Sequence, residues 1–272
     1  MIEVVRRNVS WIVRVSWVAM ALLPNALTAD RLAVSIAGWS AWSLVAIATW
    51  LEHPISLTVA RTVSPVVVAH LAVGLPAGNW EPARIVGVAC GVVALMVIAG
   101  GDYGSRQVQA GAYGDEVRHL LRIPAPIVAP AILGWSVCVA LGVVALSVDN
   151  RVVAVIAGVA GVLSTVQVGP KLHRLSRRWL VKVPAGWVVH DDVMLAENLL
   201  IRTHQVVSMA PAPSTTQAFD LTGYTTGVPL EITLRESTDV RLSQLGSRLT
   251  KTTDVVHASA VLVAPSLGQL HN

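Results

Sequence analysis

Three places in the sequence carry the ionisable residues best suited to chemistry. None of them has the residue spacing of a known catalytic or metal site. His190, Asp191 and Asp192 follow a β-type run, and adjacent acids beside a histidine suit general acid–base work. At the end of a strand such a group more often forms a solvated turn, which is the interpretation favoured here. With no serine elbow, zinc-binding helix or Cys/His pair, we predict no catalytic residue, no cofactor and no metal.

The polar, glycine-bearing stretch at 101–123 (GDYGSRQVQAGAYGDEVRHLLRI) is the second candidate. Loops longer than about 12–15 residues without structure of their own are uncommon and often functional. The run Gly100–Ser105 is not a phosphate loop, because no Lys-Ser/Thr follows the glycines and no strand precedes them. The candidate residues of this predicted functional loop are Asp102, Tyr103, Arg106, Tyr113, Asp115 and Glu116.

His70 is the third candidate, because it is the ionisable group that lies clearly inside an apolar segment. Ionisable groups inside a membrane are expensive and often functional. A neutral imidazole at this position either hydrogen-bonds across helices or lines a pathway, and interhelical packing is the favoured interpretation. A transporter usually needs several carboxylates or paired broken helices in two halves, and neither pattern is present.

Long apolar segments must position these residues. Of the 272 residues, 54% are hydrophobic and only 13% are charged. Leu32 to Leu51 is a twenty-residue segment without a formal charge, long enough to cross a hydrocarbon core of about 30 Å. We predict a transmembrane bundle over residues 1–170. Its six membrane segments lie at about 11–29, 32–51, 63–80, 83–100, 125–148 and 152–168.

The distribution of Lys and Arg predicts the orientation of this bundle. Arg6, Arg7 and Arg14 precede or begin the first segment, and a basic linker at 171–178 follows the last. Six spans place both ends on one side, so we expect an inner-membrane protein with cytoplasmic N- and C-termini. Basic residues beside a membrane also attract anionic lipid. The candidate headgroup contacts in the linker are Lys171, Arg174, Arg177 and Arg178.

After residue 178 the pattern changes to short β-type runs. Trp179–Val183 and Trp187–His190 flank the turn signal Pro184-Ala185-Gly186. Short strands at close spacing predict a small, mostly-β soluble domain over residues 179–272. The further predicted strands are Leu199–Arg202, Val206–Met209, Leu230–Leu234, Val240–Leu242 and Ala260–Val263.

The runs WLVKVPAGWVVH (Trp179–His190) and LLIRTHQVVSM (Leu199–Met209) resemble bacterial pleckstrin-homology-like domains that are attached to transmembrane helices. Together with GDYGSR and AYGDEVRHLLRIP in the 101–123 stretch, the chain is similar to an uncharacterised family of polytopic membrane proteins of actinobacteria. The Ala-, Val- and Arg-rich, lysine-poor composition fits that source. The resemblance implies an interaction module at the membrane surface.

These observations favour a membrane scaffold or interaction protein, not an enzyme, whose β domain binds a protein partner or lipid headgroups. The alternative is a small-solute transporter or channel that uses His70 and the proline-bearing third segment. The net charge of +4 is modest and no basic stripe with interleaved aromatic residues is present, so no nucleic-acid partner is expected.

The orientation can be tested with alkaline phosphatase, which is active only outside the cytoplasm. Fusions after residue 110 and after Asn272 should both be inactive, because both points are predicted to be cytoplasmic. A fusion in the turn near Asp149 serves as the active control. Phosphatase activity at residue 110 or at Asn272 would contradict the predicted orientation.

Overall fold

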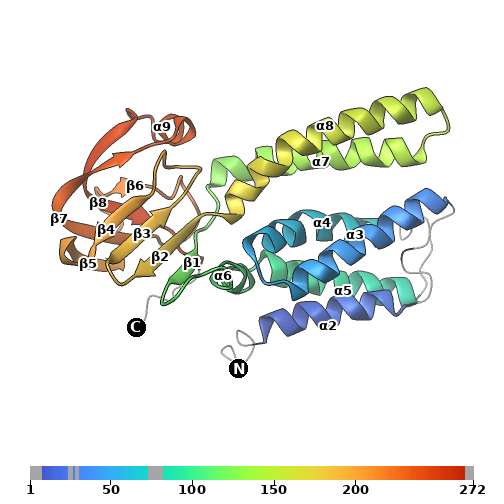
Figure 1. Ribbon diagram of the computed structural model, residues 1–272, viewed down its shortest axis with the longest axis horizontal. Coiled ribbons are helices and arrows are strands. Elements are labelled where there is room, and N and C mark those ends of the chain that lie inside the picture. Colours follow the sequence, from blue (N-terminus) through green and yellow to red (C-terminus); the bar gives the residue numbers. More distant parts are fainter. Residues whose placement is uncertain (1–7, 24–26, 28–30, 73–81, 267–272) are drawn as a thin grey trace. The chain divides into compact units, whose positions relative to one another are not determined.

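The computed structural model describes residues 8–23, 27, 31–72 and 82–266 (Figure 1). The chain forms two compact units, each built from two separate stretches of sequence. The helical unit comprises Met1–Gln107 and Leu133–Pro170, and the β unit comprises Val108–Ile132 and Lys171–Asn272.

Five helices are long and apolar enough to cross a membrane, which agrees with a membrane protein. They are α3 (Leu32–Trp50), α4 (Pro54–Ala72), α5 (Pro82–Ala99), α7 (Ala125–Ser147) and α8 (Arg151–Ser176). The predicted first segment at 11–29 is helical only over α2 (Val9–Ala21), whose 13 residues give about 20 Å of helix. Residues 24–26 and 28–29 of that segment lie outside the described residues, as do Arg6 and Arg7. Within the described residues there are therefore five helices of spanning length and one shorter apolar helix.

The third predicted segment, 63–80, is shifted relative to helix α4. The helix begins at Pro54, where proline is tolerated because a first-turn N–H needs no helical partner. It also contains Arg61, whose Nε donates to the carbonyl of Ile98 (3.3 Å) at the end of α5. A helix C-terminus carries partial negative charge, so the cation is accommodated there. Residues 73–80 of the predicted segment lie outside the described residues.

Small residues allow the helices to approach closely. A Cβ at Gly91 of α5 would lie 2.6 Å from Cγ2 of Val68 in α4, so only glycine fits between these helices. In the hairpin of α7 and α8, a Cβ at Gly161 would lie 3.3 Å from Cβ of Leu141. The apolar core of α2 to α5 is formed by Trp17, Met20, Leu27, Val45, Val67, Val68, Leu71 and Ala94.

The β unit contains two four-stranded sheets (Figure 1). The first has the order β1-β2-β3-β4 and the second has the order β5-β7-β8-β6. The strands of the first sheet are β1 (Val117–Leu120), β2 (Trp179–Val183), β3 (Gly186–His190) and β4 (Leu199–Arg202). Those of the second sheet are β5 (Val206–Pro211), β6 (Phe219–Asp220), β7 (Leu230–Arg241) and β8 (Val255–Val263). The sequence patterns locate β2, β3, β4 and β5 to within two residues at each end.

The second sheet differs in detail from the prediction. The predicted strands 230–234 and 240–242 are parts of the single strand β7, which pairs with β8 across a register shift between Thr233 and Thr238. A bulge of this kind leaves residues without partners and interrupts the alternating pattern. The short helix α9 (Gln244–Thr250) and the two-residue strand β6 were not predicted.

The predicted functional loop at 101–123 is not unstructured. It contains helix α6 (Gly101–Gln109) and strand β1, which pairs antiparallel with β2. The predicted linker at 171–178 is likewise helical, since α8 continues to Ser176. The β unit therefore includes a strand that precedes α7 in the sequence, and a domain defined as 179–272 leaves that strand out.

The two sheets are joined into one core. Isolated bridges connect Leu121 with Pro265 and Leu195 with Leu242. The shared core is lined by Leu121, Leu180, Val189, Ile201, Ile232, Val240, Val261 and other buried residues of both sheets. Leu121 follows β1 directly and is 3% exposed. The strand that comes from the N-terminal half is thus part of the hydrophobic core.

This arrangement predicts how fragments behave. A fragment of 171–272 should be unfolded or marginal, because it loses the core packing of Leu121, worth about 2–5 kcal/mol. Total domain stability is only about 5–15 kcal/mol. Joining residues 112–124 to its N-terminus through a flexible linker should restore cooperative urea unfolding and a β-rich circular dichroism spectrum. Equal stability of the two fragments would show that β1 is dispensable.

Candidate interaction surface at the end of helix α8

The basic run after the last apolar segment begins on helix α8. Its 26 residues give about 39 Å of helix, whereas a hydrocarbon core of about 30 Å needs about twenty residues. If the span begins at Arg151, Lys171 and Arg174 lie at headgroup depth. Both side chains are exposed, and residues three apart share one face of a helix. Two of the four predicted headgroup contacts thus present their charges outward.

Arg178 does not. Its side chain is 1% exposed and makes a two-pronged ion pair with Asp191, with Nε 2.8 Å from Oδ1 and Nη2 2.6 Å from Oδ2. Its Nη1 also donates to the main-chain carbonyl of Arg122. A guanidinium whose nitrogens are all engaged inside the domain cannot bind a lipid headgroup. Arg178 therefore has a structural role instead of the predicted contact with lipid headgroups.

Asp191 is the other half of that arrangement. Besides Arg178, its Oδ1 accepts the main-chain N–H groups of Val193 (3.0 Å) and Met194 (3.1 Å). The carboxylate is 1% exposed, so the predicted solvated turn at 190–192 is buried at its central residue. Buried charges are tolerated when they are paired and hydrogen-bonded. Here three nitrogens of Arg178 donate and both oxygens of Asp191 accept hydrogen bonds.

Arg177 and His190 form a more accessible group beside this buried pair. The imidazole of His190 stacks on the Trp179 indole, with centroids 4.9 Å apart. Its Nδ1 lies 2.7 Å from Oδ1 of Asn198, and its Nε2 lies 3.4 Å from Nη2 of Arg177. Arg177 is also 3.8 Å from Asp192, which offsets part of its charge. The group contains no nucleophile. Its stacking and hydrogen bonds order the chain beside the basic surface, which is formed by Lys171 and Arg174.

The later part of the predicted loop packs on the same sheet. Arg118 of β1 lies over the Trp179 ring at 5.2 Å and forms an ion pair with Glu116 at 2.9 Å. The hydrogen bond from Arg118 lowers the pKa of Glu116. Tyr113 and Asp115 belong to the exposed turn before β1, in which Gly114 has a φ of +56°. Glu116 is therefore a partner of Arg118, while Tyr113 is 81% exposed.

The earlier part of that loop belongs to the helical unit. Asp102, Tyr103 and Arg106 lie on α6, and Tyr103 is fully buried. Burial raises the pKa of Tyr103 to about 12, from an ordinary value of 10. Gln107, one turn later, is also buried, and its Oε1 accepts the main-chain N–H of His53 (2.9 Å). The structure thus divides the six predicted loop residues between two units.

Arg14 is the polar anchor of the helical unit that sequence reasoning did not identify as a site. Its Nε donates to the carbonyl of Thr49 (3.0 Å), and its Nη2 forms an ion pair with Glu52 (3.2 Å). Its guanidinium also lies over the rings of Trp11 and Trp50, at 5.2 and 4.6 Å. These contacts join the start of α2 to the end of α3. Arginine three residues after a tryptophan is the one signal that could have suggested them.

His70 lies at the contact between helices α4 and α3. A Cβ on Gly38 of α3 would be 3.4 Å from two atoms of the imidazole ring. Glycine at 38 thus makes room for the ring, and α3 and α4 pack along their length. This geometry supports interhelical packing.

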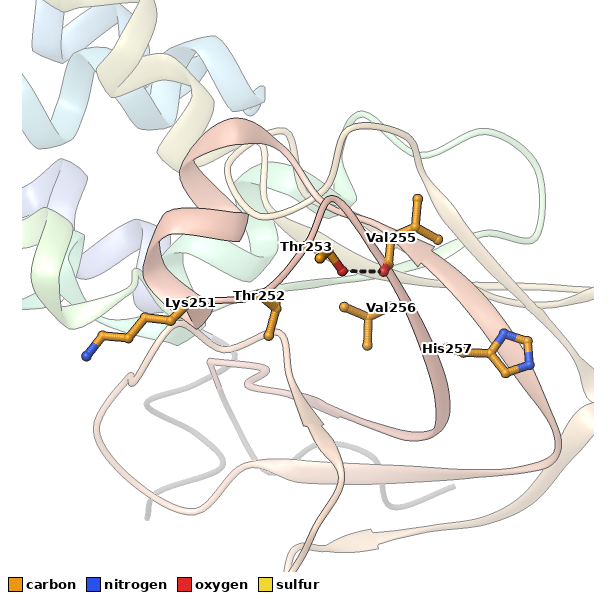
Figure 2. A pocket seen from close by; sticks show the side chains of 6 residues that line it. All are labelled: Lys251, Thr252, Thr253, Val255, Val256 and His257. Carbon is orange, nitrogen blue, oxygen red and sulfur yellow. Dashed lines mark hydrogen bonds between the residues drawn. The ribbon is translucent and has the colours of Figure 1, made fainter.

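Two other features carry no site chemistry. Among the residues that the structure describes, no three His, Cys, Asp or Glu side chains are grouped to hold a metal ion. A shallow, open hollow between α9 and β8 is lined by Lys251, Thr252, Thr253, Val255, Val256 and His257 (Figure 2). Inside it Thr253 donates to the carbonyl of Val255 (2.9 Å), and the His257 ring is paired with Asp239. The hollow therefore has no convergent set of free polar groups.

No family model matches this chain, and neither a curated protein nor a solved structure matches it.

The structural role of Arg178 predicts a large effect of its removal. Arg178→Met leaves the Asp191 charge buried and should lower the free energy of local unfolding in β2 to β4 by about 3–5 kcal/mol. Hydrogen exchange of these strands in the full-length protein measures this loss. Arg241→Met is the matched control, because its ion pair with Glu197 is 62% exposed on both sides and is worth only about 0–1 kcal/mol. Equal effects of the two substitutions would contradict the assignment.

Proposed function

We propose that this chain is a polytopic membrane protein whose β unit is an interaction module that binds anionic phospholipid headgroups at the cytoplasmic surface. The observation that carries the proposal is the exposure of Lys171 and Arg174 on the last turns of α8. A span that begins at Arg151 would put both residues at headgroup depth. The predicted orientation places them in the leaflet surface that carries anionic lipid. The pleckstrin-homology-like resemblance of the strands points to the same kind of module.

The strength of such binding follows from the number of available charges. A cation near an anionic membrane surface contributes about 1 kcal/mol. Lys171 and Arg174 contribute fully, Arg177 contributes less because Asp192 lies 3.8 Å away, and Arg178 contributes nothing. The expected attraction is about 2–3 kcal/mol, which selects anionic lipid around a protein that the apolar helices already anchor.

The β unit holds these charges in place without a flexible linker. Helix α8 continues to Ser176, and Arg178 is fixed by Asp191 two residues later. The basic side chains therefore project from a rigid helix end. The backbone that carries them loses little conformational entropy when they bind lipid together. A disordered basic tail would lack this advantage, because ordering costs free energy on binding.

The test is selective retention of lipid by the purified full-length protein. Native mass spectrometry should show more bound phosphatidylglycerol than phosphatidylcholine from an equimolar mixture. Lys171→Gln with Arg174→Gln should abolish most of this preference. Arg202→Gln with Arg235→Gln is the matched control: it removes two exposed charges near the β4–β5 corner, away from the helix ends, and should leave the preference intact.

The outcomes separate the lipid from a protein ligand. Loss of preference in the Lys171/Arg174 variant alone supports headgroup binding. Equal retention of both lipids by the unaltered protein would overturn it and leave a protein partner as the ligand to seek.

A further inference from the structure

We propose that the loop at 221–229 (LTGYTTGVP), between β6 and β7, is a second membrane contact that places Tyr224 and Val228 in the interface between lipid headgroups and acyl chains. The occupant of this surface is the phospholipid interface. The inference shares with the proposed function the membrane placement of the β unit, but it rests on different residues and on apolar contact instead of charge.

The loop is held against the residues that lead into helix α7. Arg122 donates from Nη2 to the carbonyl of Val228 (2.8 Å) and from Nη1 to the carbonyl of Thr226. The hydroxyl of Thr225 donates to the carbonyl of Ile123 (3.1 Å). Three loop residues are thus bound to two consecutive residues of the 122–124 segment, immediately before the helix begins.

Two glycines make this close contact possible. Gly223 has a φ of +66°, and a Cβ there would lie 2.7 Å from Cβ of Pro124. Gly227 has a φ of +88°, and a Cβ there would strike Nη1 of Arg122. Both positions need glycine for conformation and for space. The carboxylate of Asp220 further orders the loop by accepting the main-chain N–H of Thr222 (2.7 Å).

The depth of the loop follows from the length of helix α7. Its 23 residues, Ala125 to Ser147, give about 34 Å of helix, only slightly more than a hydrocarbon core of about 30 Å. Ala125 therefore lies within a few residues of the hydrocarbon boundary. Residues 122–124 are at headgroup depth, and the loop that binds them is there too. The loop and the first turns of α7, up to Ile132, belong to the same compact unit.

The chemistry of the loop suits that depth. Residues 221–229 include no charged side chain. Tyr224 is 59% exposed and Val228 is 67% exposed, so both present apolar surface outward. Tyrosine is enriched at membrane interfaces, because its ring is apolar and its hydroxyl reaches the polar layer. An exposed valine in the same loop adds apolar area that lipid would cover.

The experiment measures depth in the bilayer. In the full-length protein with Cys90 and Cys138 replaced by Ala, a nitroxide is attached to Tyr224→Cys or to Val228→Cys in nanodiscs of phosphatidylcholine and phosphatidylglycerol. Val207→Cys is the matched control, since Val207 is also 59% exposed. It lies on β5, at the opposite edge of the β5-β7-β8-β6 sheet, about 14 Å across from β6.

Power-saturation electron paramagnetic resonance should show a shift toward oxygen accessibility and away from a water-soluble nickel chelate at 224 and 228, compared with 207. Two reporter positions are used because Tyr224 has a φ of +60°, a backbone conformation that cysteine rarely adopts. Nickel accessibility at 224 and 228 equal to that at 207 would overturn the proposal. Protection from both reagents would also overturn it, because it would mean that protein covers the loop.

Lipid composition distinguishes this inference from the proposed function. Apolar insertion should persist in nanodiscs of phosphatidylcholine alone, where the basic surface has no anionic ligand. Loss of the depth signature in that lipid would show that the loop reaches the membrane only through headgroup charge, and would overturn the inference. Failure of lipid selectivity in the preceding experiment leaves the depth measurement unaffected.

Discussion

The β unit depends on one buried ion pair. Arg178 and Asp191 are each 1% exposed, and the arginine also donates to the carbonyl of Arg122. One guanidinium thus joins three separate stretches of chain: the end of α8, the turn after β3 and the segment that leads into α7. Removing a partner from such a pair leaves an uncompensated charge in a low-dielectric interior. Because both connections to the membrane helices meet at this pair, the domain and the helix ends form one structural unit.

The polar residues of the helical unit are used for packing and for helix ends. Arg14 is engaged by Thr49, Glu52 and two tryptophan rings, and Arg61 binds the carbonyl of Ile98 at the end of α5. The ring of His70 fits against Gly38. Each of these groups has a local task that holds one helix to another. We therefore place the proposed recognition in the β unit, where Lys171 and Arg174 are exposed.

Local patterns predict those parts of the structure whose cause is local. The apolar blocks predict α3, α5 and α7 closely, and Pro184-Ala185-Gly186 predicts the hairpin of β2 and β3. Strand β1 has four residues and a pairing partner about sixty residues away, so no nearby signal identifies it. Arg178 could not be separated from Lys171 and Arg174 by type or spacing. Only the carboxylate of Asp191, supplied by the folded sheet, decides which of these cations is buried.

The two connections between the helices and the β unit carry different chemistry. Helix α8 ends in exposed cations, whose attraction to lipid is electrostatic and weakens as salt shortens the Debye length. The cation of the segment before α7 is instead used within the domain. Arg122 donates hydrogen bonds to the carbonyls of Thr226 and Val228, and burial lowers the pKa of its guanidinium. What faces outward beside it is an uncharged loop with an exposed tyrosine and valine. Under the proposed function, charge at one connection would select the lipid, whereas apolar contact at the other would fix the tilt of the domain whatever the lipid. We expect a domain held at both connections to have little freedom to rotate on the membrane, so its remaining surface would keep one orientation toward the side predicted to be cytoplasmic.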